Sequence, residues 1–231
     1  MKAHTTQQMP TRGTLLAALL IVLGTSSSLA AQTAGPVTIP PLAPDVAVRP
    51  FVLVSAQRFA ASETFKAVFG GAVQPIWGGG AQVALSNGLY GDIAISRFRK
   101  TGERVFRLDG ETFPLGIPLT ATIMPIEITG GYRFGADWSG RFIPYVGAGL
   151  ASYKYQETSD FAQAGDDVDQ RGTGYLVVGG AEFRVHRWIV ASADVQFTHV
   201  GGVLGKAGIS QQVREDDLGG IAVRFRIMIG R

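Results

Sequence analysis

The sequence predicts an all-β protein, an eight-stranded antiparallel up-and-down transmembrane β-barrel. Gly accounts for 31 of the 231 residues, which is about twice its usual share. Period-two alternation of apolar and polar residues recurs along the chain. Long and short connections alternate between these segments, as in barrels with short turns at one rim and long loops at the other. The chain has no Cys, which excludes disulfide scaffolds, thiolate catalysis and Cys-ligated zinc.

The first thirty residues have the order of parts found in a secretory signal peptide. Lys2 and Arg12 are basic, Leu15–Leu23 is apolar, and small residues precede a cleavage site after Ala30. The apolar run is too short for a spanning helix, which needs about 20 residues. Cleavage lowers the 21 basic residues to 19 against 18 acidic ones. The mature chain is therefore nearly neutral, and no nucleic acid is expected as a partner.

Residues 31–50 hold five prolines and are expected to form a tail that leads into the barrel. Proline lacks a backbone donor and favours extended conformations. Beyond this tail, no stretch has the roughly 18 consecutive apolar residues of a transmembrane helix. We therefore expect residues 51–231 to form one barrel.

Eight segments in this range alternate as strands do when their two faces meet different surroundings. The last is the clearest, because Ile221, Phe225 and Ile229 share one face and Arg224 and Arg226 share the other. The predicted strands are residues 51–58, 78–86, 89–98, 117–134, 142–155, 174–185, 188–200 and 221–230.

The connections between these strands alternate strictly in length. Short turns are expected at residues 86–88, 135–140 and 185–188, and longer links at residues 59–77, 99–116, 156–171 and 201–218. The first long link contains Ser62, a predicted N-cap of one or two helical turns. The second contains Asp109-Gly110, which predicts a hairpin that extends the neighbouring strands.

Acidic residues gather in the other two long links. Their spacing does not match a recognised calcium loop, so they are expected to be solvated. They are Asp160, Asp166, Asp167 and Asp169 in one link, and Glu215-Asp216-Asp217 in the other.

Period-two alternation fits either a soluble barrel with an apolar interior or a membrane barrel with a polar one. Three features favour the membrane barrel. The polar faces carry four acids and four bases, and charges in a narrow, filled interior must be paired. Trp138 and Trp188 lie near strand ends, as interfacial aromatic residues do, and the exported chain finishes on a strongly amphipathic strand. The expected interior network is Asp92, Glu127, Arg133, Glu182, Arg184, Asp194, Arg224 and Arg226.

Three segments follow the exported leader with a shared pattern of Gly, aromatic and apolar residues. They are Ile128–Phe134 (ITGGYRF), Phe142–Tyr155 (FIPYVGAGLASYKY) and Gly174–Phe183 (GYLVVGGAEF). The chain thereby resembles the small outer-membrane β-barrel domains of OmpA and OmpW type. The resemblance implies a place in the cell outer membrane, contact with its lipid and lipopolysaccharide, and folding by the barrel assembly machinery. Such barrels usually end in an aromatic residue, whereas Phe225 is the last aromatic residue here.

The expected function is that of a non-enzymatic, monomeric barrel without cofactor or metal. Eight strands are too narrow for a wide aqueous pore, so the lumen is expected to be closed and the role to be structural or loop-mediated binding. Small barrel hydrolases that deacylate lipid A use an outward His with a Ser two residues later. His199 is predicted to face outward, but Gly201 stands at the second position, so the hydroxyl nucleophile is missing.

The sequence leaves three alternatives open. One is a channel for small apolar solutes with a lateral exit, as OmpW-like barrels are thought to form. Another is a lipid-modifying barrel enzyme, and the third is a soluble periplasmic ligand carrier. Bilayer conductance, lipid hydrolysis and partition between water and detergent distinguish these three from the closed barrel.

Overall fold

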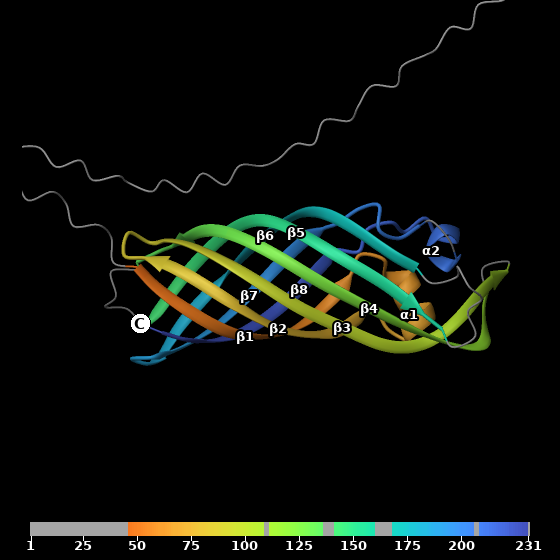
Figure 1. Cartoon of the computed structure of the whole chain (residues 1–231), viewed down its shortest axis with the longest axis horizontal. Coiled ribbons are helices and arrows are strands. Elements are labelled where there is room, and N and C mark those ends of the chain that lie inside the picture. Colours follow the sequence, from red (N-terminus) through yellow and green to blue (C-terminus); the bar gives the residue numbers. More distant parts are fainter. Residues whose placement is uncertain (1–45, 109–110, 136–140, 160–167, 206–207, 231) are drawn as a thin grey trace, which may run out of the picture. The chain divides into compact units, whose positions relative to one another are not determined.

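The computed structural model describes residues 46–108, 111–135, 141–159, 168–205 and 208–230. In this range the chain forms a closed barrel in which eight antiparallel strands follow one another in sequence order and β8 pairs with β1 (Figure 1). The predicted eight-stranded up-and-down barrel is confirmed. Its strands are β1 (Val46–Phe59), β2 (Val73–Leu85), β3 (Leu89–Leu108), β4 (Glu111–Arg133), β5 (Phe142–Thr158), β6 (Val168–His186), β7 (Ile189–His199) and β8 (Gly220–Ile229).

The first strand starts earlier than the sequence predicts. The expected signal peptide and most of the expected tail lie outside the described residues, but β1 already begins at Val46. Pro50 argued against a strand at this point. It is tolerated because it lies just before Phe51, where the pairing with β8 begins, and so at the end of that ladder.

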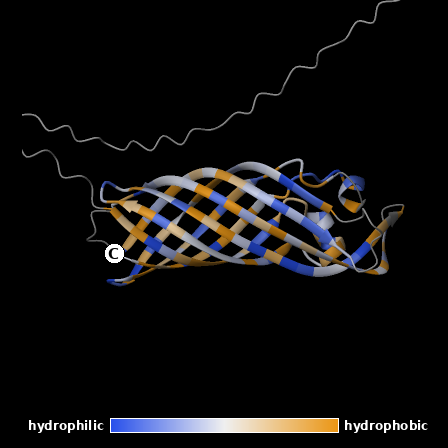
Figure 2. Cartoon of the chain, in the orientation of Figure 1, coloured by the Kyte–Doolittle hydropathy of each residue, from blue (hydrophilic) through white to orange (hydrophobic). Residues whose placement is uncertain are grey.

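The side chains of the strands point alternately out of and into the barrel. On β8, Phe225 is 56% exposed, whereas the neighbouring Arg226 is 2% exposed. Figure 2 shows the same alternation of hydrophobic and hydrophilic residues along the strands. The structure therefore has the predicted arrangement of a membrane barrel, with apolar side chains outside and charged ones inside.

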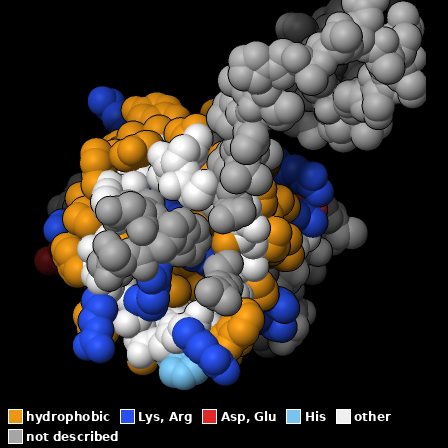
Figure 3. All heavy atoms as spheres, turned by 90° about the vertical axis from the view of Figure 1, so that its left-hand side faces the viewer, with side chains coloured by type: hydrophobic (Ala, Val, Ile, Leu, Met, Phe, Trp, Pro, Cys, Tyr) orange, Lys and Arg blue, Asp and Glu red, His pale blue; other side chains and the backbone are white. Residues whose placement is uncertain are grey.

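The two ends of the barrel differ as predicted. The three short connections, the start of β1 and the end of β8 lie at one end of the barrel. Figure 3 views this end directly and shows apolar side chains around the rim with basic ones among them. The other end carries two helices, α1 (Ser62–Phe69) between β1 and β2 and α2 (Gly208–Gln212) between β7 and β8. Neither helix has the length and hydropathy that a membrane-crossing helix needs, among the residues described.

Two long links are largely strand. β3 and β4 remain paired up to Leu108 and Glu111, which confirms the predicted extension, although the turn at residues 109–110 lies outside the described residues. β5 and β6 also continue, and Asp169 pairs with Gln156 within that ladder. Asp169 is thus a strand residue rather than part of an acidic loop, while Asp160, Asp166 and Asp167 lie outside the described residues.

Replacing Phe225 with Arg should destabilise the barrel by roughly 2–4 kcal/mol, because this outward position lies in the middle of β8 and an arginine there faces hydrocarbon. The matched variant Val46→Arg, at the short-turn end of β1, should cost about 1 kcal/mol or less. Urea unfolding in lipid vesicles measures both. Equal losses would contradict a membrane-facing outer surface.

Candidate functional site

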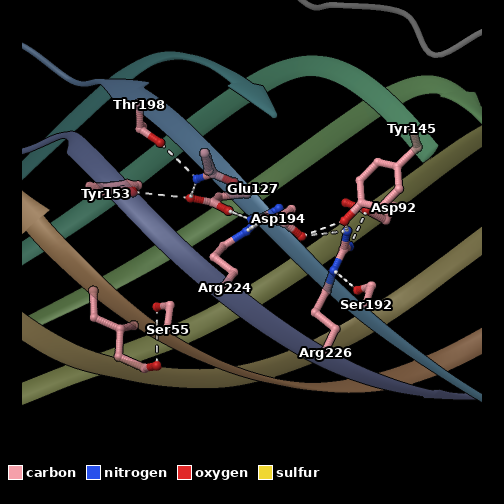
Figure 4. A network of polar contacts seen from close by, with 12 residues as sticks. Ser55, Asp92, Glu127, Tyr145, Tyr153, Ser192, Asp194, Thr198, Arg224 and Arg226 are labelled. Atoms are coloured by element: carbon pink, nitrogen blue, oxygen red, sulfur yellow. Dashed lines mark hydrogen bonds and ion pairs between the residues drawn. The ribbon is translucent and has the colours of Figure 1, made fainter. Parts of the chain in front are cut away.

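The centre of the barrel interior is crossed by ion pairs (Figure 4). Arg224 of β8 lies between two carboxylates, with its Nε 2.6 Å from Asp194 Oδ1 and its Nη1 3.3 Å from Glu127 Oε2. Asp194 is on the neighbouring strand β7, but Glu127 is on β4, four strands away in the closed sheet. The contact between Arg224 and Glu127 therefore spans the lumen.

Arg226, the next inward residue along β8, makes a second set of contacts. Its guanidinium lies 2.9 Å from Asp92 of β3 and 3.1 Å from Asp194. It also donates to the hydroxyls of Tyr145 (2.6 Å) and Ser192 (3.3 Å). The Tyr145 hydroxyl in turn donates to Asp194 at 2.6 Å. Asp194 thus joins the two arginines into one network.

Neutral polar side chains complete the hydrogen bonding of Glu127. Its Oε1 accepts from the Tyr153 hydroxyl at 3.1 Å and from Gln196 Nε2 at 2.8 Å, and Gln196 also donates to Thr198. Buried charges are tolerated when their remaining hydrogen-bonding capacity is met in this way. The charged members of this network were predicted from the sequence. Tyr145 and Tyr153 were missed, although both lie on the inward face of β5.

A second charged group lies nearer the short-turn end. Glu182 of β6 accepts from Arg49 of β1 at 3.2 Å and pairs with Arg133 of β4 at 3.1 Å. Arg184, also expected in the interior network, is half-buried and close enough to Arg49 to interact electrostatically. Arg49 was missed because it falls within the proline-rich segment. The signal that could have found it is the inward alternation of Phe51 and Leu53, which continues back to Arg49.

The absence of a side chain at Gly80 leaves space for the Phe51 ring, which packs beside Arg226. Gly80 of β2 lies against β3, and a Cβ there would meet the Ile93 carbonyl oxygen at 1.9 Å and the Phe51 ring at 2.7 Å. The Phe51 ring occupies this space, and the Arg226 guanidinium lies 5.4 Å from its centroid. Gly80 and the two glycines before it lie within β2.

The end of the barrel with the helices is filled by an aromatic cluster. Phe65 of α1 stacks on Phe59 of β1 at 3.9 Å and packs near Phe69 and Phe98. The same buried cluster contains inward side chains from β1 to β6, together with Val200 just after β7. Because these strands surround Phe65, α1 sits within this mouth of the barrel and closes it.

Both ends of α1 are held by side chains from other parts of the fold. Glu215, in the link before β8, accepts hydrogen bonds from the backbone N–H groups of Glu63 (3.0 Å) and Thr64 (2.8 Å) and from the Thr64 hydroxyl. Lys100 Nζ of β3 donates to the Phe69 carbonyl at the helix C-terminus at 3.0 Å. An acid at the N-terminus and a base at the C-terminus both suit the helix dipole.

These contacts correct two sequence predictions. The helix forms as predicted, but Ser62 is not its N-cap; Ala61 holds that position and makes no side-chain cap. Glu215 is not a solvated rim residue, because it supplies the cap from about 150 residues away in sequence. Local sequence cannot reveal a cap that comes from a distant loop.

Asp217 is likewise hydrogen-bonded within the fold rather than solvated. Its Oδ1 accepts from the backbone N–H groups of Val200 and Gly219 at 2.8 Å, and its Oδ2 lies 2.8 Å from His199 Nδ1. The His199 ring also packs beside Tyr175 on the outer face. A Cβ on Gly201 would lie 3.5 Å from His199 Nε2. The structure thus contains a histidine–carboxylate pair, and a glycine lies where a nucleophile would complete it.

A cavity of about 420 Å³ lies beside α1 in the same mouth. Its lining is mainly apolar and comes from α1, from β3 to β6 and from the link before β8. The lining side chains include Phe65, Phe69, Leu119, Tyr155, Val203 and Leu204. In the part of the chain that is described, no three metal-ligating side chains come together.

A closed barrel with an apolar exterior and paired charges inside defines a small eight-stranded transmembrane β-barrel of the outer-membrane type. Three solved structures of this kind are similar to the chain. The N-terminal barrel domain of Pseudomonas aeruginosa OprF has 12% identity and a TM-score of 0.45, over 79% of this chain and 97% of that one. Ail of Yersinia pestis, in complex with the heparin analogue sucrose octasulfate, has 13% identity and a TM-score of 0.45, over 82% and 97%.

Outer membrane protein W of E. coli has 19% identity and a TM-score of 0.41, over 79% of this chain and 96% of that one. No family model matches the chain, and no curated protein matches it significantly. At this level of identity the likeness extends to the fold alone, so the function must be inferred from the chain's own residues.

Replacing Arg224 with Met should cost about 3–5 kcal/mol of unfolding free energy, because it removes a buried cation that contacts two carboxylates. Lys154→Met is the matched control, since the ion pair of Lys154 with Asp169 is largely solvated and should contribute less than about 1 kcal/mol. Urea unfolding measures both. A loss at Arg224 no larger than that at Lys154 would show that the interior pairs do not hold the barrel.

Replacing Glu215 with Ala should loosen α1 without unfolding the barrel, with a local loss of about 0.5–2 kcal/mol as for other helix caps. Hydrogen exchange of the Glu63 and Thr64 amides should accelerate, while strand amides keep their protection. Asp216→Ala, a change of the exposed neighbouring acid, serves as the control and should leave both amides unchanged. Unchanged exchange in Glu215→Ala would rule out the cap.

Proposed function

We propose that this protein is a non-enzymatic outer-membrane β-barrel with a closed, charge-paired lumen, and that its role is structural or depends on binding by its loops. The observation that carries this proposal is the ionic layer of Arg224, Arg226, Asp92, Glu127 and Asp194, which crosses the barrel from β8 to β3 and β4. These side chains are held by one another, so the interior at this level is occupied rather than open.

The aromatic cluster around α1 supports the same proposal, because it closes the helical end of the barrel. Solute entering at the helical end meets Phe59, Phe65 and Phe98 before it reaches the charged layer. The helix is fixed at both termini by Glu215 and Lys100. Two consecutive barriers of opposite polarity are a poor pathway for either ions or apolar molecules.

The proposed setting follows from the same architecture. The short-turn end faces the periplasm and the helical end faces outward, as in other outer-membrane barrels. The leader at residues 1–30 is proposed to be a cleaved signal peptide, and the barrel assembly machinery is the proposed folding partner. The barrel is closed on itself without a second chain, which supports a monomer in contact with outer-membrane lipid and lipopolysaccharide.

The lipid-modifying enzyme is disfavoured by the geometry at His199. Asp217 orients the ring, but no hydroxyl hydrogen-bonds to Nε2 within the described ranges, and Gly201 offers no side chain. Nucleophilic hydrolysis needs such a group next to the base. We expect no lipid A deacylation by the wild-type chain, and His199→Ala should not change that background.

A second candidate function is the binding or passage of a small apolar solute, as in the channel alternative. The cavity beside α1 favours it, because Phe65, Leu119 and Leu204 give that cavity an apolar lining. Titration with an apolar fluorescent probe tests this candidate. Leu119→Trp, which reduces the cavity, should weaken binding of the probe if the cavity is the site.

In planar bilayers the folded protein should show no resolvable single-channel current, because its lumen is crossed by ion pairs. The double variant Phe65→Ala/Phe69→Ala should also remain silent, since it opens only the helical end and leaves the ionic layer in place. A mobility difference between boiled and unboiled protein in detergent gels confirms that the barrel is folded. Discrete current steps from the wild-type protein would overturn the closed lumen.

A further inference from the structure

The outer surface of the barrel carries a groove of about 950 Å³ that runs over β8, β1, β2 and β3. Apolar side chains that point away from the barrel form its floor, namely Val52, Val54, Phe225 and Ile227. Trp77 of β2 is 73% exposed and stands at its edge. The groove is therefore a hollow in the face that we assign to lipid.

The backbone of β2 lines the hollow at Gly78, which follows Trp77. The Cβ position of Gly78 faces the barrel interior, because its partners on the neighbouring strands, Leu53 and Ser96, are buried inward residues. The hollow is therefore bounded by the Trp77 ring and by the outward side chains of the neighbouring strands.

Two arginines on the neighbouring strand also line the groove. Arg97 pairs directly with Trp77 across the β2–β3 ladder, and Arg99 follows two residues later on the same outward face. The outward residues before them, Ile93 and Ile95, are apolar. The outward face of β3 therefore changes from apolar to cationic at Arg97.

Neither guanidinium has a counter-charge within the described part of the chain. No ion pair or hydrogen bond joins Arg97 or Arg99 to another described side chain, and no acidic residue lines the groove. By contrast, Arg224 and Arg226 inside the barrel each contact two carboxylates. An outward arginine costs little only near the membrane interface, where an aromatic ring such as that of Trp77 is also favoured.

We propose that this groove binds an acylated, phosphate-bearing glycolipid of the outer leaflet, the chemistry of the lipid part of lipopolysaccharide. Arg97 and Arg99 would hold its phosphate by charge-assisted hydrogen bonds, and its acyl chains would lie along Val52, Phe225 and Ile227. The proposal rests on the membrane location proposed above and adds a specific lipid site to it. Phosphate oxygens supply the counter-charge that the two arginines lack.

The orientation of the groove fits such a ligand. Arg97 and Arg99 lie on the helical side of Ile95, and the helical end carries the long connections that face outward in such barrels. The apolar pair of Val52 and Ile227 lies closer to the short-turn end than Val54 and Trp77. A lipid with its phosphate at the outer interface would therefore extend its chains toward the bilayer centre along this floor.

Native mass spectrometry of the detergent-solubilised, full-length mature protein tests the site with diphosphoryl lipid A as the probe. The wild type should retain one lipid A, and Arg97→Gln/Arg99→Gln should bind it roughly tenfold more weakly, because charged hydrogen bonds are lost. Arg171→Gln is the matched control, since Arg171 is an exposed arginine on β6, away from the groove, and its loss should leave binding unchanged. Trp77→Ala should weaken binding as well, through the edge of the groove.

The nature of the headgroup is tested by competition. Dephosphorylated lipid A and phosphatidylglycerol should each displace diphosphoryl lipid A at least tenfold less effectively than unlabelled diphosphoryl lipid A does. Equal binding by the wild type and the double arginine variant, or equal displacement by phosphatidylglycerol, overturns the proposal. The gel mobility shift on boiling is followed in every variant, so that a failure to form a membrane barrel is recognised separately from a failure to bind the glycolipid.

Discussion

The pairing of charges across a narrow interior is the constraint on which the rest of this barrel depends. Four carboxylates and four arginines lie almost fully buried, and each contacts an opposite charge on another strand: Asp92, Glu127, Glu182, Asp194, Arg49, Arg133, Arg224 and Arg226. A charge in such a place is costly unless it is paired and hydrogen-bonded. Each strand must therefore keep its register, since a slip of one residue would turn these side chains outward and bring apolar ones inside.

The interior is organised in layers that follow from this constraint. The group around Glu182 lies toward the short-turn end, the network around Asp194 crosses the middle, and the aromatic cluster of Phe59 and Phe65 fills the helical end. The helix that closes the mouth is itself fixed electrostatically, by Glu215 at one terminus and Lys100 at the other. Closure and stability therefore come from the same kinds of contact, and the exterior remains free to interact with lipid.

Much of the fold was predictable because its signals are local. Alternation in β8 places Phe225 on one face and Arg224 on the other. Because buried charges must be paired, the equal numbers of acids and bases on the polar faces favour a membrane barrel with a charged interior. The charged residues of the central layer could be named in the same way. Arg49 could not, because proline content in residues 31–50 concealed the start of β1, and Glu215 could not, because its cap on α1 joins segments far apart in sequence.

Residue order thus settles which side chains share a face, since the period of a strand is fixed by backbone geometry. It also supplies equal numbers of acidic and basic residues on the polar faces. It places Gly201, which has no hydroxyl, two residues after His199. Only the closed barrel decides which charges meet, because the contact of Arg224 with Glu127 arises from strands on opposite sides of the lumen. The groove beside Trp77 is likewise a product of closure, since β8 reaches β1 and β2 only when the last strand pairs with the first.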